Sequence, residues 1–577
     1  MKRIPQILVR QLAKSPNKIA VRRLPVPIEE IKEVPLLAVG GKWTDIMEDG
    51  TREKLENVLP RYLSGQRWFG GKARSVQAVR IFDWTVVPAQ HALVFWILLK
   101  VEFQEGAFDL YSLPLGVVAG PGAQSQGGRV VARLSGLKEE RLLIDALADD
   151  AACMALLSAI AGGRELATRN GLIRAEPTAA FAALRGPPGT PLPVVQGPTT
   201  SSNSLVVFGR RLLLKLFRRL DAGINPELEI GRFLTEKTRF SAIPQTGGSI
   251  IYLRRNTEPI TLAILQQLVP NNGDCWHQAI DELERFFNRT RTLHDGPDES
   301  ALENHSWLEL VGTDPPPGVL KEIGSYLQVA CTLGERTADL HLALAKDKKD
   351  PAFAPEPMTV RDLEVLAAGA CRQGRQALAV LREKLDSLPE ALGPSARAVL
   401  KEGQNLLKQS EALPAMKINA AKIRCHGDYH LGQVLRTEND LVIVDFEGEP
   451  ARPIAERRAK QSPLKDVAGM LRSFSYAAYA GLFAFTQHRP QDLEILNPWA
   501  ELWQRWTAVF FLKEYLATAE APDFLPADPD QFSTLLQFFM LEKTFYELVY
   551  ELNNRPDWVR IPLEGILSLG RHPVTVS

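Results

Sequence analysis

Residues 425–449 of this chain read CHGDYHLGQVLRTENDLVIVDFEGE, and this stretch decides the fold that we expect. Two aspartates, Asp428 and Asp445, stand 17 residues apart, and the amide Gln433 follows the first of them. Between them, the turn-prone letters END precede a short apolar run with β-branched residues, Leu441–Val444. The pattern predicts a short hairpin that delivers Asp445 from the end of a buried strand, a rigid mount for a metal ligand.

Two carboxylates and an amide in this layout are typical of a kinase-like phosphotransfer site. Asp428 can accept the proton of an acceptor hydroxyl, while Gln433 and Asp445 hold Mg²⁺ against the phosphates of a nucleotide. His-Gly-Asp takes the place of the protein kinases' His-Arg-Asp, and Asp-Phe-Glu takes the place of Asp-Phe-Gly, which indicates a small-molecule variant of the site. The alternative is a loop and a strand end of an unrelated fold. The combination with Gln433 and the intervening strand favours the kinase interpretation.

The composition excludes several classes of protein. The 577 residues are enough for several domains, and 68 basic residues balance 68 acidic ones, so no global field attracts nucleic acid or an anionic membrane. No apolar run reaches the roughly 18 residues of a membrane span, and the basic N-terminus lacks the apolar core of a signal peptide. Five scattered cysteines without a CxxC pair argue for a reducing compartment. We therefore expect a cytoplasmic protein without nucleic-acid or membrane partners.

Hydrophobic periodicity divides the chain into four expected parts. They are an irregular N-terminal extension (1–53), an α+β cap subdomain (54–150), a nucleotide-binding N-lobe (151–270) and a mainly helical catalytic and acceptor C-lobe (271–577). In the cap the patterns predict a helix over 51–63, strands over 76–87, 92–101, 107–115 and 130–134, and a helix around 142–147. In the C-lobe they predict helices over 320–346, 360–385, 394–413, 464–485, 497–518 and 531–553. The expected fold class is α/β (α+β), a bilobal protein-kinase-like fold with an N-terminal cap.

A kinase-like site also needs groups that bind the nucleotide. The polar turn 197–204 joins two expected strands, and its Ser202 and Asn203 offer hydroxyl, amide and backbone N–H groups to phosphate oxygens. Backbone groups near Gln267 and Val269, at the end of the last N-lobe strand, are expected to bind the adenine. No GxxxxGK[ST] motif is present, so the sequence excludes a P-loop enzyme.

Lys215 is the candidate for holding the phosphates. It lies within the apolar strand LLLKLF, where an ammonium group is unfavourable unless phosphates and a carboxylate pair with it. A helix starts near Pro226, and we expect its Glu229, or less favourably Glu227, to supply that carboxylate. The alternative is a lysine on an edge strand that faces solvent.

The acceptor side rests on a helix near the C-terminus. Lys543, Tyr546 and Tyr550 share one helix face at spacings i, i+3 and i+7, which combines flat stacking surface with a hydrogen-bond donor. His430 lies two residues beyond the first aspartate, where it either contacts the sugar or braces the loop. The charged segment around Glu447 either shapes the acceptor pocket or forms a solvated surface. For the two tyrosines, the alternative is ordinary packing of the helix against the core.

Several stretches resemble the maltokinase family, and the match runs from about residue 50 to the end. They are QRWFGGK (66–72), SSNSLVVFG (201–209), LKLFRRLDAGINPELE (214–229), LGERTADLHLAL (333–344), CHGDYHLGQVL (425–435), the block 445–478 and NRPDWVRIPL (554–563). The resemblance implies an enzyme that uses ATP and Mg²⁺ to make maltose 1-phosphate for α-glucan (glycogen) synthesis. It also implies that the helix of Lys543 contacts maltose, and that Asp466 steadies the catalytic loop.

The first 50 residues depart from that family. LPVPIEEIKEVPLLAVGGKW (24–43) resembles the junction that precedes the kinase in fusions with trehalose synthase, so association or fusion with that enzyme is expected. Three other functions stay open: a kinase of another sugar or aminosugar such as glucosamine, a non-catalytic glucan-binding scaffold, and a metal-dependent hydrolase. In the hydrolase, His426, Asp428, His430 and Asp445 would bind the metal. That interpretation leaves Lys215 unexplained.

Overall fold

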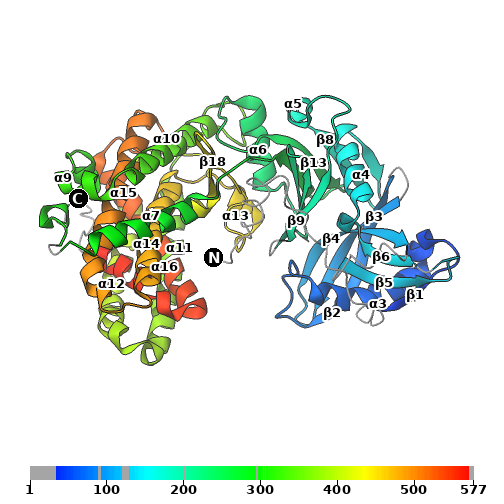
Figure 1. The fold of residues 1–577 in the computed structure, drawn as a ribbon, viewed down its shortest axis with the longest axis horizontal. Helices are drawn as coiled ribbons and strands as arrows, with labels where there is room; N and C mark the ends of the chain where they lie inside the picture. Colours follow the sequence, from blue (N-terminus) through cyan, green and yellow to red (C-terminus); the bar gives the residue numbers. More distant parts are fainter. Residues whose placement is uncertain are drawn as a thin grey trace. The chain divides into compact units, whose positions relative to one another are not determined.

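The computed structural model describes residues 34–88, 93–119, 129–139, 141–199, 202–293, 296–302, 305 and 307–570. The chain forms two compact units, Met1–Asn272 and Gly273–Ser577 (Figure 1). Most of the expected N-terminal extension, residues 1–33, lies outside the described residues. Within the described ranges, no helix is both long and apolar enough to cross a membrane.

The first unit begins with a seven-stranded sheet covered by a helix. Its strands are β1 (Leu36–Ala38), β2 (Val76–Pro88), β3 (Leu93–Phe103), β4 (Phe108–Ala119), β5 (Val130–Ser135), β6 (Arg141–Asp145) and β12 (Arg219–Leu220). The order is β1-β5-β6-β4-β3-β2, with β12 paired to β4. Helix α3 (Asp49–Gly65) buries Leu55, Leu59 and Leu63 against the sheet, as the apolar spacing predicted.

Two expectations for this region are wrong. Residues 142–147 form strand β6 and a short 3-10 turn instead of a helix, because Leu142, Leu143 and Ile144 pair with β4 and β5. A short apolar run does not by itself distinguish strand from helix. Residues 34–53 are not irregular: β1 pairs in parallel with β5, the 3-10 helix η1 (Trp43–Met47) follows, and α3 starts at Asp49.

The second seven-stranded sheet is antiparallel, in the order β7-β8-β13-β14-β11-β10-β9. Its strands are β7 (Glu165–Ala167), β8 (Leu172–Pro177), β9 (Val194–Thr199), β10 (Asn203–Phe208), β11 (Leu212–Phe217), β13 (Thr246–Leu253) and β14 (Ile260–Gln267). Its helices are α4 (Asp150–Ala161), α5 (Phe181–Arg185) and α6 (Pro226–Lys237). The N-cap Asn225 accepts a hydrogen bond from the Glu227 amide, and Pro226 takes the first helical position.

The two sheets are joined inside the first unit. Val87, Trp96 and Leu98 of the first sheet share a core with α4 and the second sheet. A buried ion pair between Arg218 and Asp145 and a hydrogen bond from Tyr252 to Asp83 link the same parts. The division of this unit into a cap and a nucleotide lobe at residue 150 stays a prediction.

The second unit is mainly helical. Its helices are α7 (Cys275–Thr290), α8 (Trp307–Val311), α9 (Pro317–Ile323), α10 (Tyr326–Leu344), α11 (Val360–Lys384), α12 (Gly393–Glu411), α13 (Ile454–Arg458), α14 (Leu464–Thr486), α15 (Asp492–Ala519), α16 (Pro529–Asn554) and α17 (Arg560–Gly570). Two small sheets, β15 (Glu356–Pro357) with β16 (Ala421–Lys422) and β17 (Val434–Arg436) with β18 (Leu441–Ile443), complete it. Helix α14 packs against α7, α15 and α16, so it runs through the core of the unit (Figure 1).

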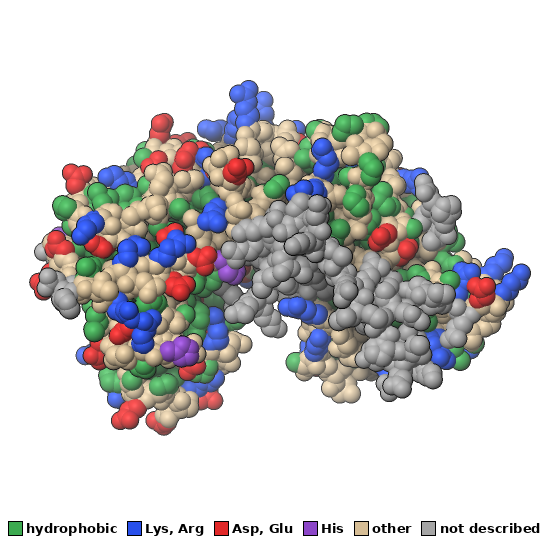
Figure 2. All heavy atoms as spheres, viewed as in Figure 1, with side chains coloured by type: hydrophobic (Ala, Val, Ile, Leu, Met, Phe, Trp, Pro, Cys, Tyr) green, Lys and Arg blue, Asp and Glu red, His purple; other side chains and the backbone are tan. Residues whose placement is uncertain are grey.

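Helix boundaries in this unit follow local capping signals. Thr359 and Asp362 form a reciprocal capping box at the start of α11, and Asp528 caps α16 ahead of Pro529. The predicted helices 360–385 and 531–553 are therefore confirmed to within two residues. On the face seen in Figure 2, acidic and basic side chains are interspersed over this unit.

Candidate active site

The loop that carries Asp428 lies along one stripe of α14. The carboxylate of Asp466 accepts hydrogen bonds from the backbone N–H groups of His426 (2.7 Å) and Gly427 (2.9 Å). Ser473 accepts a hydrogen bond from the N–H of Leu431 at 3.0 Å. Residues 466 and 473 stand two helical turns apart on one helix face. One face of one helix thus sets the path of the loop.

Glycine is required at two positions of this contact. Gly469 lies between the two polar residues on the same stripe, and a Cβ there would lie 2.6 Å from the carbonyl oxygen of Tyr429. Gly427 has a φ of 83°, in the left-handed region that side chains disfavour. The Gly of His-Gly-Asp is therefore explained by backbone conformation. Gly469 and Ser473 were not predicted, because small residues inside a helix resemble ordinary core positions.

Asp466 is itself held by a buried histidine. His341 of α10 and Asp466 are essentially inaccessible, and their Nε2 and Oδ2 atoms lie 3.3 Å apart. The other ring nitrogen of His341 lies 3.0 Å from the hydroxyl of Tyr515. Burial opposes ionisation of Asp466, but the contact with His341 and the two backbone donors outweigh it, and its pKa lies below its ordinary value. The structure thus provides the loop support that the sequence led us to expect from Asp466.

The predicted hairpin is confirmed. Strands β17 and β18 pair antiparallel, with Val434 opposite Ile443, and Asp445 follows β18 after one residue. The φ of Asp445 is 71°, an uncommon value for a residue with a side chain. Backbone strain of this kind persists where the surroundings over-determine it, typically at functional sites.

Gln433 and Asp445 lie together, as predicted for a metal-binding pair. The amide nitrogen of Gln433 donates to Oδ2 of Asp445 at 3.0 Å. Its Oε1 atom is buried and has no hydrogen-bond partner among the described residues. An amide oxygen without a partner beside a carboxylate matches the oxygen ligands that Mg²⁺ takes. The two side chains therefore fit a magnesium ion.

His426 connects the two motifs. Its Nε2 lies 3.0 Å from the carbonyl oxygen of Val444, immediately before Asp445, and its ring packs on that of Phe446 with centroids 4.8 Å apart. Its other nitrogen faces the N–H of Asp428 at 3.4 Å. Both ring nitrogens of His426 therefore face backbone groups, and this arrangement fixes the loop relative to the hairpin.

His430 braces the loop. Its Nδ1 accepts a hydrogen bond from the N–H of Gly432 at 3.1 Å, and burial lowers its pKa to about 4. Among the described residues, His426, Asp428 and His430 do not bring three ligand atoms together as a metal site requires. The geometry argues against the metal-dependent hydrolase.

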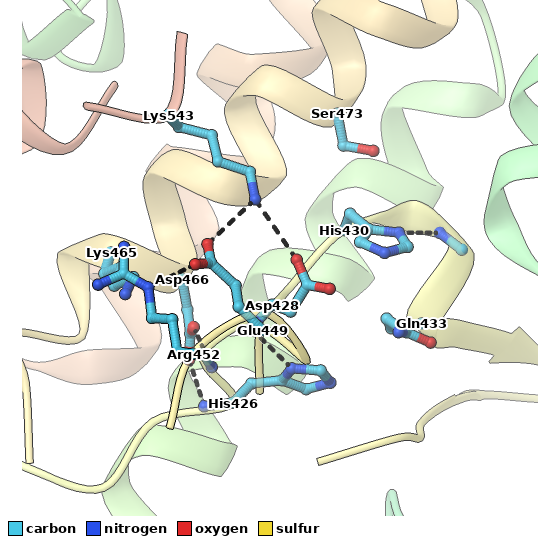
Figure 3. A network of polar contacts seen from close by, with 12 residues as sticks. His426, Asp428, His430, Gln433, Glu449, Arg452, Lys465, Asp466, Ser473 and Lys543 are labelled. Carbon is cyan, nitrogen blue, oxygen red and sulfur yellow. Dashed lines mark hydrogen bonds and ion pairs between the residues drawn. The ribbon is translucent and has the colours of Figure 1, made fainter. Parts of the chain in front are cut away.

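Lys543 of α16 lies against the expected base. Its Nζ is 3.4 Å from Oδ1 of Asp428 and 3.5 Å from Oε1 of Glu449 (Figure 3). Burial opposes ionisation of Asp428, but Lys543, and after it His430 and His426, outweigh this, so the pKa of Asp428 is lowered. Burial likewise opposes the charge of Lys543, and the two carboxylates raise its pKa in spite of it. Asp428 is an ionised carboxylate at neutral pH.

A pocket of about 380 Å³, open solvent included, adjoins this pair. Its lining includes Asp428, Lys543 and Tyr546, together with Gln373 of α11 and Phe539 of α16. Aromatic rings beside polar groups suit a small polar ligand with apolar faces. Every lining residue belongs to the second unit.

Other charged residues of the pocket wall were not predicted. Glu449 accepts a hydrogen bond from Nε of Arg452 at 2.6 Å, and Arg452 also reaches Glu542 at 3.3 Å (Figure 3). Glu447 was expected on the acceptor side, yet the contact with Lys543 is made by Glu449, two residues later. The backbone carbonyl of Glu447 accepts a hydrogen bond from Arg457. The repeated acidic letters of DFEGE gave no way to choose between the two residues.

The two tyrosines of α16 differ in their surroundings. Tyr546 is 40% exposed, and the ammonium of Lys543 lies 5.1 Å from its ring centroid. Tyr550 is half-buried, and the guanidinium of Arg555 lies 5.4 Å from its ring. The exposure of Tyr546 argues against pure core packing for this residue. The sugar contacts of both rings stay a prediction.

Lys215 in the first unit has a carboxylate partner, but it is Glu227 instead of the favoured Glu229. The two side chains are buried, with Nζ 2.6 Å from Oε2, and Gln266 donates to the other oxygen at 3.1 Å. Helix α6 turns by about 100° per residue, so a residue two positions later faces another direction. Strand β11 lies between β10 and β14, so the edge-strand alternative for Lys215 is wrong.

The remaining nucleotide candidates lie around the same sheet. Asn203 is buried at the start of β10, and the exposed Ser202 precedes it. The backbone oxygen of Ser202 accepts a hydrogen bond from the N–H of Arg218. Gln267 ends β14, and Val269 follows it. Positions 200 and 201 of the predicted phosphate turn lie outside the described residues, so phosphate and adenine binding here stay predictions.

Comparison with known proteins supports a kinase-like superfamily. Residues 62–149 match the family model described as the maltokinase N-terminal cap domain. A glucosamine kinase of Streptacidiphilus jiangxiensis is 25% identical over 363 residues, which cover 63% of this chain and 70% of that protein. A glucosamine kinase of Mycolicibacterium smegmatis is 25% identical over 268 residues, 45% of this chain and 58% of the relative.

A solved structure shows the fold. The structure of a glucosamine kinase in complex with glucosamine, ADP and inorganic phosphate superposes with a TM-score of 0.55 at 20% identity. The match covers 85% of this chain and 93% of the other. The mixed α/β kinase-like fold, with N-terminal sheets and a helical C-terminal region, is thereby confirmed.

Proposed function

We propose that this protein is a sugar kinase that transfers the terminal phosphate of ATP to the anomeric hydroxyl of maltose and releases maltose 1-phosphate. The observation that carries the proposal is the second unit's arrangement of Asp428, Gln433 and Asp445 on a loop and hairpin tied together by His426. The curated glucosamine kinases support the coarser conclusion, a kinase of sugars or aminosugars. The buried Lys215–Glu227 pair of the first unit suits phosphate binding.

Each residue has a role in this proposal. Asp428 orients the acceptor hydroxyl and accepts its proton, since it stays ionised at neutral pH. Gln433 and Asp445 would hold Mg²⁺, which neutralises charge on the nucleotide phosphates when bound. Lys215 binds phosphates and Glu227 orients it. Ser202 and Asn203 contact the phosphates, and backbone groups near Gln267 and Val269 bind the adenine.

The pocket beside Asp428 supports a small carbohydrate as acceptor. Lys543 and Tyr546 line it, and Tyr550 follows one turn further along α16. Between residues 543 and 550 the helix rises by about 10 Å, roughly the length of two linked sugar rings. We assign the ring that is not phosphorylated to the tyrosine face, where its binding helps to position the reacting hydroxyl.

An aminosugar is the second candidate, because the curated relatives are glucosamine kinases. Charge favours the neutral sugar for transfer to an anomeric hydroxyl. A 2-ammonium group would be adjacent to that hydroxyl, and thus near the ammonium of Lys543, which lies 3.4 Å from Asp428. Like charges at this separation repel each other. We therefore favour maltose over glucosamine.

The cellular role follows from the product. Maltose 1-phosphate is an activated disaccharide, and we propose that it feeds α-glucan (glycogen) synthesis. Association or fusion with trehalose synthase, which would supply maltose, is part of the same proposal.

A panel of sugars tests the function. The purified protein is incubated with Mg²⁺, ATP and maltose, glucose, glucosamine or trehalose, and products are identified by ³¹P and ¹H NMR. We expect maltose 1-phosphate to form fastest. A different best acceptor, or phosphate on a 6-hydroxyl, would contradict the maltokinase assignment while leaving the sugar-kinase class intact. Absence of transfer to every sugar would contradict the class.

A further inference from the structure

Lys543 is shared between two carboxylates and closely bound to neither. Its Nζ lies 3.4 Å from Asp428 and 3.5 Å from Glu449 (Figure 3). Charge-assisted hydrogen bonds between nitrogen and oxygen usually measure about 2.7–2.9 Å. Both contacts are therefore longer than a closed hydrogen bond. The ammonium can change partners with a small movement.

Glu449 has a closer partner of its own. Arg452 donates to it at 2.6 Å, so the charge of Glu449 is balanced without Lys543. Arg452 also contacts Glu542 at 3.3 Å, which ties this group to α16. Asp428 has no such second partner: Lys543 is the cation in ion-pair contact with it among the described residues. The charge of Lys543 is thus available mainly to Asp428.

The catalytic loop itself supplies no cation. Residues 426–433 contain no lysine or arginine. The ring nitrogens of His426 face backbone groups, and His430 is neutral at pH 7 because burial lowers its pKa to about 4. A phosphoryl group transferred next to Asp428 carries negative charge, and a site stabilises such charge with a cation placed in advance. Lys543 on α16 is placed to provide it.

We propose that Lys543 is a catalytic residue of the phosphotransfer proposed above, and that protonation of Asp428 releases its ammonium to the transferred phosphoryl group. An acceptor hydroxyl hydrogen-bonded to Asp428 at about 2.7 Å lies within about 6 Å of Nζ. The acceptor oxygen bonds to the terminal phosphorus of ATP as the bond from that phosphorus to the ADP oxygen breaks. The hydroxyl proton passes to Asp428, whose lost charge frees Lys543 for the phosphoryl oxygens.

This role differs from sugar binding in what it predicts. A lysine that only binds the sugar affects the KM for the sugar and has no effect on transfer to water. A lysine that stabilises the phosphoryl group lowers transfer to every acceptor, water included. Sugar-independent hydrolysis of ATP therefore separates the two roles.

The test compares Lys543→Met, Lys543→Gln and Lys543→Arg with the wild-type protein. We measure kcat and KM with the best sugar of the panel, and ATP hydrolysis without sugar. Loss of the ammonium in the Met and Gln variants is expected to lower both kcat and hydrolysis by about 10²–10³-fold. The Arg variant keeps the charge and is expected to stay within about tenfold of wild type in both.

Lys422→Met is the matched control. Lys422 is likewise shared between two carboxylates, Asp362 at 2.7 Å and Glu356 at 3.7 Å, and it lies on β16 outside the pocket. Its rates are expected to stay within about twofold of wild type, as for most partly exposed ion pairs. Nucleotide binding and heat unfolding identify any misfolded variant. The Gln variant, which keeps a donor and the length of the side chain, replaces the Met variant if that one does not fold.

Two results would overturn the assignment of Lys543. One is a folded Met or Gln variant whose kcat stays within about threefold while only the KM for the sugar rises. The other is hydrolysis at the wild-type rate in those variants. Failure of the proposed function looks different, because the wild-type protein then transfers phosphate to no sugar. Hydrolysis of ATP still tests Lys543 in that case.

Discussion

Each unit of the protein contains a lysine held by acidic groups, and the two arrangements differ. Lys215 contacts Glu227 at 2.6 Å in the interior of a sheet, with Gln266 fixing the other carboxylate oxygen. Lys543 lies 3.4 Å and 3.5 Å from its two carboxylates, at the wall of a pocket. The first pair is closed and the second is open.

The difference indicates different tasks. A closed, buried pair holds one geometry, which suits a cation that must present the same face to nucleotide phosphates in every cycle. An open pair keeps its ammonium charged while leaving it free to move when Asp428 loses its charge. Four experiments can break or sharpen this comparison, given in order of decreasing expected effect.

The largest effect is expected at the carboxylate of the open pair. Asp428→Asn removes the proton acceptor and should lower kcat by about 10²–10⁴-fold, while ATP binding and the fold persist. Steady-state kinetics and nucleotide titration measure both. Asp386→Asn, an exposed aspartate on the 3-10 helix Leu385–Ser387, is the control for the same chemical change. Near-normal turnover of the Asp428 variant would contradict its assignment.

The closed pair is tested by two neighbouring glutamates. Glu227→Gln weakens a charged hydrogen bond worth about 1.5–3 kcal/mol and should lower kcat/KM for ATP by roughly ten- to a hundredfold. Glu229→Gln, on the same helix, should change it by less than about threefold. Kinetics with ATP as the varied substrate decide the order. A larger effect of Glu229 would restore the original sequence-based assignment.

The acceptor wall should respond without the nucleotide site. Tyr550→Ala removes a stacking surface worth about 0.5–1.5 kcal/mol, so the KM for maltose should rise roughly two- to tenfold. The KM for ATP should stay constant. Tyr550→Phe keeps the ring and serves as the control. A change in the KM for ATP alone would show that α16 does not serve the acceptor.

The smallest expected effect is on pH dependence. Three groups face Asp428: Lys543 from α16, and His426 and His430 from its own loop. The carboxylate form is active, so activity falls as the pH drops through the lowered pKa of Asp428. Lys543→Met removes the main group that lowers this pKa, and burial then raises it. The acid limb of kcat/KM should therefore move to higher pH.

The Arg variant is the control for this profile. Lys543→Arg retains a cation, so its acid limb should stay close to that of the wild-type protein. An unchanged limb in the Met variant would show that Lys543 does not set the charge of Asp428.

Much of this fold follows from local sequence patterns. The helices of the second unit and the β17–β18 hairpin were predictable because their apolar spacing and caps agree with their packing. Strand β6 was not, since Leu142–Ile144 is too short to show a period. The pairing of β1 with β5 was also hidden, because a parallel contact between distant segments leaves no local signal.

The site shows the same limit. Asp428, Gln433 and Asp445 stand close in sequence and fit a known layout, and the structure brings Gln433 and Asp445 together. The choice between Glu227 and Glu229 depended on the phase of a helix relative to a strand, which no pattern in α6 reveals. The contact of Glu449 with Lys543 joins residues 94 positions apart in the sequence.

The cradle that α14 makes for the catalytic loop has a consequence for evolution. Asp466, Gly469 and Ser473 fix the loop, whereas the contacts proposed for the sugar come from α16. Chemistry and substrate choice are therefore encoded on separate helices. Mutations on the pocket face of α16 can exchange one acceptor for another while the phosphotransfer machinery is inherited unchanged. A lineage built on this plan can change its substrate by small steps and remain an active kinase at each one.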